Sequence, residues 1–172
     1  DVGVALGDVT AQAFVTETVG PVPEVVLPPE GGGPFTDSLA ALDLTIDGTT
    51  VPIVGALEVL TEGALGEQGN AHSSAVLTDV SPEGSNELFA VVADSITVDC
   101  SADLGAVVGT TTILGGEAGD PIPESPAPNT IVLDANETIS VPGGSISLSA
   151  FVIANEQTVG DRSIAVNGVR QT

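Results

Sequence analysis

Few residues in this chain are suited to catalysis, and they do not form a recognisable set. The only histidine is His72, within Ala71-His72-Ser73-Ser74, and the only cysteine is Cys100. A nucleophilic triad needs a base beside a serine or cysteine and a third group that orients the base. A lone histidine among small residues meets one part of that requirement. We therefore interpret His72 as a structural or surface histidine and expect that the chain is not an enzyme.

Metal chemistry is restricted in the same way. Zinc sites are built from several His and Cys ligands, and the chain has one of each. Oxygen ligands for calcium are plentiful, but Asp43 with Asp47 and Asp94 with Asp99 lack the spacing of an EF-hand loop. We predict no cofactor, and the sequence leaves calcium binding open.

Carbohydrate chemistry has weak support. Paired carboxylates can hydrolyse glycosides, but among 24 acidic residues some pair is always available. Binding of a polysaccharide by stacking is not expected, because the chain has no Tyr and no Trp. Asn136-Glu137-Thr138 is an acceptor sequon for N-glycosylation, which predicts an exposed position for Asn136.

The charge balance excludes one class of partner. The formal net charge is −22, with no lysine and two arginines, Arg162 and Arg170. Nucleic acid is excluded because almost nothing can neutralise its phosphates. The many acidic groups repel one another at low ionic strength. We therefore expect the protein in salt-rich or divalent-rich surroundings, where this repulsion is screened. We interpret the acidic residues as a solvated surface, with specific cation binding as the alternative.

The apolar pattern bears on membrane spans, and the N-terminus bears on the compartment. No apolar stretch approaches the roughly 20 residues that a membrane span requires, so we predict no membrane span. The chain opens at Asp1 without methionine, which fits secretion after cleavage of a leader. We expect an extracellular or cell-surface protein.

The hydrophobic pattern predicts an all-β fold. The chain has 172 residues, 42% of them hydrophobic, which suits one domain with an aliphatic core. Apolar residues alternate with polar ones and helical periodicity is nearly absent. We predict a single antiparallel β-sandwich or barrel-like domain with long Pro/Gly-rich loops, at 20–34 and 115–128.

Two strands stand out. Ser145 to Ala154 has serines on one face and apolar residues on the other, and Ser95 to Ala102 places Cys100 inward as a small buried hydrophobe. Shorter strands are predicted over 42–46 and 131–133, and at Ile164 and Val166. Asp47-Gly48 and Asn167-Gly168 are dipeptides typical of tight hairpins.

The N-terminus carries a separate signal. Val2, Val4 and Leu6 alternate in one parity, whereas Val9 begins a run in the other. A β-bulge would shift the register in this way, and so would a break between a short apolar arm and the domain. We delimit residues 1–8 as an N-terminal exchange arm and residues 9–172 as a single β domain.

Segments along most of the chain together resemble the choice-of-anchor P family of bacterial surface proteins. The match rests on their order, because each is weak alone. They are Ala11-Gln12-Ala13-Phe14, Val19-Gly20-Pro21-Val22-Pro23, Val26-Leu27-Pro28-Pro29 with Gly31-Gly32-Gly33, Ala71-His72-Ser73-Ser74-Ala75 with Asp79-Val80, the strand ending at Cys100 with Gly115-Gly116, Ala127-Pro128-Asn129-Thr130, Ala154-Asn155-Glu156-Gln157-Thr158 and Ile164-Ala165-Val166-Asn167.

The resemblance implies a secreted or surface-displayed protein and supplies no catalytic residues. Combined with the apolar arm, it leads to a first hypothesis, a structural homo-oligomer that forms a filament or sheath by β-strand exchange through Val2, Val4 and Leu6. The alternative is a monomeric display or adhesive module that binds cations or a basic partner through acidic loops. A hydrolase that depends on His72 is the remaining alternative.

Overall fold

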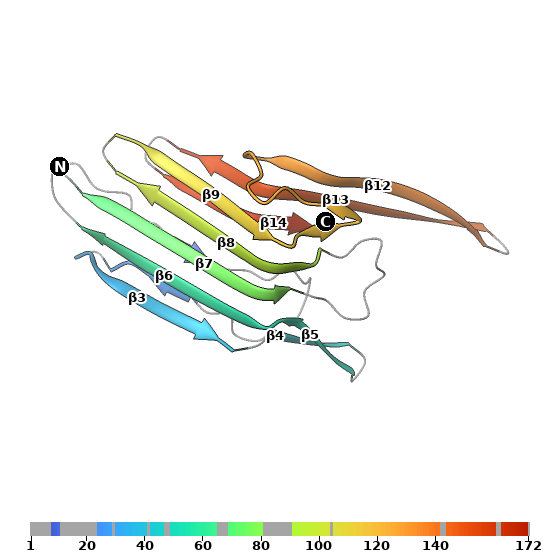
Figure 1. The fold of residues 1–172 in the computed structure, drawn as a ribbon, viewed down its shortest axis with the longest axis horizontal. Coiled ribbons are helices and arrows are strands. Elements are labelled where there is room, and N and C mark those ends of the chain that lie inside the picture. The colour runs from blue at the N-terminus through green and yellow to red at the C-terminus, as the bar shows by residue number, and fades with distance from the viewer. Residues whose placement is uncertain are drawn as a thin grey trace.

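The computed structural model describes residues 8–10, 24–28, 30–40, 42–46, 49–64, 69–80, 91–103, 105–141, 144–160 and 163–171. Within these residues every regular element is a β-strand, and all strand pairs are antiparallel (Figure 1). The predicted all-β, sandwich-like fold is confirmed. The strands are β1 (Asp8–Thr10), β2 (Glu24–Val26), β3 (Gly32–Leu39), β4 (Leu42–Ile46), β5 (Thr49–Val54), β6 (Ala56–Ala64), β7 (Asn70–Val80), β8 (Ala93–Ala102), β9 (Val107–Leu114), β10 (Glu117–Ala118), β11 (Asp120–Pro121), β12 (Thr130–Val141), β13 (Gly144–Val159) and β14 (Ile164–Gln171).

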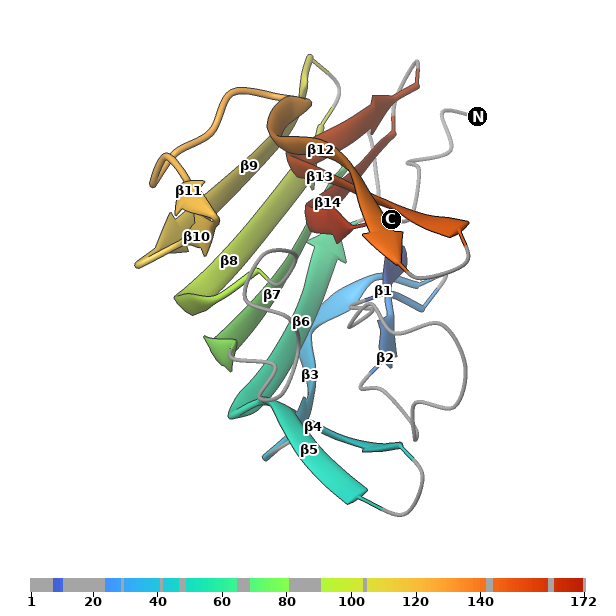
Figure 2. The ribbon, with the colours of Figure 1, turned by 90° about the vertical axis from the view of Figure 1, so that its right-hand side faces the viewer.

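Two layers make up the sandwich. The larger sheet has five strands in the order β3-β6-β7-β8-β9, and the smaller has three in the order β12-β13-β14. Strand β14 packs across β8 and β9, and the β1-β2 ribbon packs on β3, β6 and β7 (Figure 2). One face of the five-stranded sheet is therefore covered by two separate pieces, the three-stranded sheet and the β1-β2 ribbon.

The core is aliphatic, as the composition predicts. It forms two clusters of buried side chains, and Leu77 packs against both of them. Small and branched side chains interdigitate well on pleated surfaces, and among the described residues the two clusters contain no buried aromatic side chain. The larger cluster is Val91, Ala93, Ile96, Ile113, Ala118, Ile122, Val152 and Ala154, and the smaller is Val25, Leu57, Val59 and Ala75.

The strand predicted over Ser145 to Ala154 is confirmed within β13. Ala150, Val152 and Ala154 are buried, while Ser147 and Ser149 on the other parity are exposed. The strand continues past Ala154 because Asn155, with φ of 52°, changes the alternation, so that both Ala154 and Asn155 are buried. This local break places both Ala154 and Asn155 on the buried side of β13.

The hairpin predicted at Asn167-Gly168 is wrong. Strand β14 runs straight through this dipeptide. Gly168 is buried, and a Cβ there would lie 2.7 Å from Val98 Cγ2 and 2.8 Å from Ile96 Cγ2. Gly168 therefore serves the close approach of β14 to β8, not a turn.

The other turn and loop predictions fare better. Ile46 pairs with Thr49, so β4 and β5 form the predicted hairpin, although Asp47-Gly48 itself lies outside the described residues. The segment 115–128 is ordered by β10, β11 and the buried Ile122. The segment 20–34 contains β2 and the start of β3. Of the predicted arm, residues 1–7 lie outside the described residues, and Asp8 is the first residue of β1, where it pairs with Val26 of β2.

Candidate functional site

The free edge of β14 is a candidate assembly site. Among the described strands, β14 pairs with β13 alone, so its second edge has no strand beside it. Ile164 and Val166 are half-buried and Gly168 is buried, facing β9 and β8. A strand added at this edge would extend the three-stranded sheet and cover the core beside it.

The edges of the five-stranded sheet are better protected. Strand β3 contains Pro34 and a register shift between Gly32 and Phe35, and its Asp37 lies opposite buried Val59. Proline, bulges and charges are common protections of edge strands. Strand β3 is therefore a poor template for another strand.

Strand β9 is protected by contacts from elsewhere in the chain. Gln157 Nε2 donates a hydrogen bond to the Gly109 carbonyl oxygen at 2.8 Å, and Ile113 N donates to the Glu124 carbonyl oxygen at 2.8 Å. Both hydrogen bonds occupy backbone groups of β9 that would otherwise be available to pair with an added strand. This leaves the smaller sheet as the more open of the two.

A buried polar clamp joins the two sheets and is centred on Asn155. Its Nδ2 donates to the Pro126 carbonyl oxygen at 2.8 Å, and its Oδ1 accepts from Thr111 Oγ1 at 3.1 Å and from Gln157 Nε2 at 2.9 Å. Gln157 N also donates to Asn129 Oδ1 at 2.9 Å. Asn155, Gln157 and Asn129 lie in segments on which the expected resemblance to choice-of-anchor P rests. Their role in this fold is structural, which sequence reasoning did not identify.

Glu156 forms an ion pair beside the clamp on the solvent side. Its Oε1 accepts from Arg170 Nη1 at 2.7 Å and its Oε2 accepts from Asn167 Nδ2 at 2.8 Å. These hydrogen bonds, first from Asn167 and then from Arg170, lower the pKa of Glu156 below its ordinary 4.5. The pair joins β13 to β14 next to the candidate edge.

This pKa shift predicts a pH-dependent contribution to stability. Because the folded pKa is depressed, the contribution is complete above pH 4.5 and is lost as the pH falls through the folded pKa. The free-energy gap between the native chain and Glu156→Gln should thus shrink on acidification, measured by urea unfolding across pH. Glu58→Gln, at an exposed position on β6, is the control. A gap that stays constant with pH would contradict the assignment.

His72 lies between two carboxylates on the outer face of the five-stranded sheet. Its Nδ1 is 3.4 Å from Glu62 Oε1, and its Nε2 is 3.3 Å from Asp99 Oδ1. The three residues come from β6, β7 and β8. A histidine that activates a nucleophile keeps one nitrogen for the hydroxyl or thiol, whereas both nitrogens of His72 face acids. The arrangement is that of a cross-strand polar contact between the imidazole and two carboxylates.

A cavity of about 630 Å³ opens beside His72, at the ends of β6, β7 and β8. Glu62, Ser101, Asp103 and Gly33 help to line it. Ser101 lies opposite His72 in the strand register, but the histidine ring is already held between Glu62 and Asp99. The cavity therefore contains a serine without an available base from His72.

Cys100 is half-buried on β8. Burial, and then the charge of Asp99, raise the pKa of its thiol. Because the thiolate is the nucleophile, this environment disfavours reaction at Cys100. The inward direction predicted for Cys100 fits its register opposite buried Ser73, although its burial is only partial.

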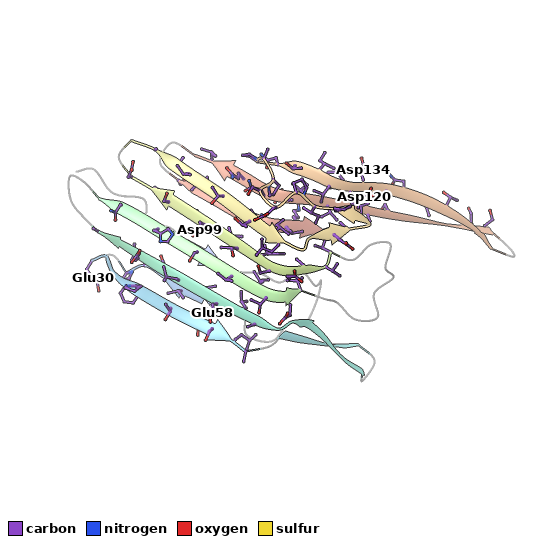
Figure 3. All side chains as sticks on the ribbon, in the orientation of Figure 1. Glu30, Glu58, Asp99, Asp120 and Asp134 are labelled. Atoms are coloured by element: carbon purple, nitrogen blue, oxygen red, sulfur yellow. The ribbon has the colours of Figure 1, made fainter. Side chains whose placement is uncertain are left out.

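The acidic side chains are distributed over the molecule. Glu58, Asp99 and Asp134 lie on β6, β8 and β12 (Figure 3). In the described part of the chain, no group of three or more His, Cys, Asp or Glu is placed to hold a metal ion. Calcium binding stays a prediction without a located site.

Two further predicted positions remain. Asn136 is exposed on β12, as expected for a sequon, with Nδ2 at 3.5 Å from Asp134 Oδ1. Whether it carries a glycan stays a prediction. Val2, Val4 and Leu6, the predicted assembly residues, lie outside the described residues.

Comparisons with known proteins give no indication of function, so the function is argued from the structure of this chain. Across the described segments, no helix is long and apolar enough to cross a membrane. No family model, no curated protein and no solved structure matches this chain.

Proposed function

We propose that this chain is an extracellular structural protein that polymerises into a filament or sheath by β-strand exchange. The observation that carries the proposal is the free edge of β14, whose half-buried Ile164 and Val166 lie at the margin of the core. The donor is the apolar arm with Val2, Val4 and Leu6. The acceptor is the β14 edge of the next copy.

The pattern of the arm suits this acceptor. Alternate residues of a strand point to one face, so three apolar side chains of the arm would face the core together. The backbone of the arm would pair with the unpaired groups of β14. Because donor and acceptor are different surfaces, each added copy presents a new acceptor, and the contact propagates without closing.

Charge sets the conditions for assembly. Copies with a net charge of −22 repel each other until salt screens them. Residues 2–6 contain no charged residue, so the exchanged segment adds no repulsion of its own. Assembly should therefore become stronger as ionic strength rises, which fits a protein that works outside the cell.

Deletion of residues 1–6 tests the donor. We expect the shortened chain to fold and to lose every species larger than a dimer, because no apolar strand remains to fill the next copy's edge. Sedimentation velocity at high salt gives the size distribution, and circular dichroism checks the fold. Replacing Gly3 and Ala5 with serine, which leaves the apolar positions intact, is the matched control and should still polymerise.

Two outcomes would redirect the assignment. Polymers that persist after the deletion would refute exchange through the arm. A full-length chain that stays monomeric and gains melting temperature in millimolar calcium would support the cation-binding display module, because a ligand that binds only the folded state stabilises it.

A further inference from the structure

The β12–β13 hairpin projects from the body of the domain as a ribbon of two strands (Figure 1). Its pairs run without a register shift from Leu133 and Val152 to Val141 and Gly144. Strand β14 pairs with β13 only from Val152 onward. Along residues 144–151, β13 thus has a single partner among the described strands. A ribbon of two strands is marginally stable in water and is stabilised by a third strand or by packing.

Over residues 144–151, the edge of β13 away from β12 carries no charged residue and no proline, and no described strand pairs with it. The sequence has no charged residue from Thr138 to Asn155, although the whole chain has a net charge of −22. Edge strands normally carry charges, prolines or covering segments, as β3 and β9 do here. A second copy of this acidic chain would meet no like charge along residues 144–151, whereas a basic partner would find nothing there to attract it.

The sequence of this edge is also symmetric. Ser145-Ile146-Ser147-Leu148-Ser149 reads nearly the same in both directions about Ser147. In an antiparallel pair of two copies centred at Ser147, each serine faces a serine and Ile146 faces Leu148. Residues directly opposite in such a pair share one face of the sheet. The exposed serines would continue one hydroxyl face across both copies.

We propose that residues 144–151 of β13 pair antiparallel with the same segment of a second copy. The two β12–β13 hairpins then form one sheet in which β13 is no longer an edge over these residues. The contact is isologous and closes as a dimer. It uses neither the arm nor the free edge of β14, so it does not depend on strand exchange and would join two polymers side by side.

Charge substitutions at the symmetry centre test the contact. Ser147→Asp or Ser147→Lys alone places two like charges opposite each other, which destabilises the pair. In the chain without residues 1–6, which cannot exchange its arm, each variant should sediment as a monomer where the unsubstituted chain is a dimer, with a dimer dissociation constant raised about tenfold or more. Mixing the two variants in equal amounts should restore the dimer, since the opposed charges now attract. Thr110→Asp and Thr110→Lys, at an exposed position on β9, should leave the native dimer unchanged.

Two results would overturn the proposal. One is a chain without residues 1–6 that shows no dimer at any concentration, and the other is a dimer that the charges at position 147 do not affect. A milder variant covers any loss of folding: Ser147→Cys with Cys100→Ser should form a disulfide-linked dimer on oxidation. The deletion distinguishes the two contacts, because removal of residues 1–6 should abolish the long polymers formed by arm exchange and leave this dimer intact.

Discussion

Replacement of Asn155 by alanine should lower the melting temperature by about 6–12 °C. Asn155 is 3% exposed, and its loss leaves the buried Pro126 carbonyl and Thr111 hydroxyl without their partner. Each unsatisfied buried polar group costs about 1–3 kcal/mol, so a total near 3 kcal/mol is expected. For a domain of this size, each kcal/mol corresponds to about 2–4 °C. Calorimetry or a circular dichroism melt measures the shift.

Two further variants separate the clamp from the backbone conformation. Asn155 has φ of 52°, a region that costs most L-residues about 1–2 kcal/mol but costs glycine almost nothing. Asn155→Gly should therefore melt above Asn155→Ala but below the native chain. Asn136→Ala, at an exposed asparagine, should melt within about 2 °C of native, because surface substitutions change stability little. Equal melting of Asn155→Ala and the native chain would contradict the clamp.

Enlarging Gly168 should also destabilise the fold. A Cβ at this position would lie 2.7 Å from Val98 Cγ2 and 2.8 Å from Ile96 Cγ2, across the interface between the sheets. Overpacking of a core by one methyl group typically costs about 1–3 kcal/mol. Gly168→Ala should lose about that much in urea unfolding, and Gly168→Val should lose more because two further methyl groups must fit.

The matched control is a glycine in open surroundings. No atom lies within 4 Å of a Cβ built on Gly144, so Gly144→Ala should change the unfolding free energy by less than about 1 kcal/mol. A similar loss for Gly144→Ala and Gly168→Ala would show that the effect comes from the backbone and not from contact between the sheets.

Strands can be predicted well from the sequence where one face of the strand is buried and the other is exposed to solvent. Residues 145–154 satisfy this condition, and β13 follows the prediction. Strand β12 was predicted only at 131–133, yet it extends to Val141. Its outer half alternates polar residues with Ala135, Ile139 and Val141, but Glu137 interrupts the apolar parity, and pairing with β13 decides its conformation. Local turn propensity likewise failed at Asn167-Gly168, because the approach of β14 to β8 decides the role of Gly168.

The interactions of single residues were harder to predict than the fold. Asn155 bonds to Thr111 and Pro126, and His72 contacts Asp99, all partners distant in sequence. Nothing in the local pattern indicates such partners, since only the order of the strands brings them together. The exposure of Asn136 was predictable because the sequon lies among polar residues on β12.

Cross-linking between copies tests strand exchange most directly. Ala5, between the apolar positions of the arm, is changed to cysteine in one copy. In the other copy, exposed Ala165 of β14 or exposed Ser163, which precedes β14, is changed to cysteine, and both copies carry Cys100→Ser. Positions that lie opposite each other on the outward face should form a disulfide when the two copies are mixed and mildly oxidised. The account predicts a mixed dimer on a non-reducing gel that disappears when Val2, Val4 and Leu6 are changed to aspartate. No mixed dimer under conditions in which the native chain polymerises would contradict strand exchange through the arm.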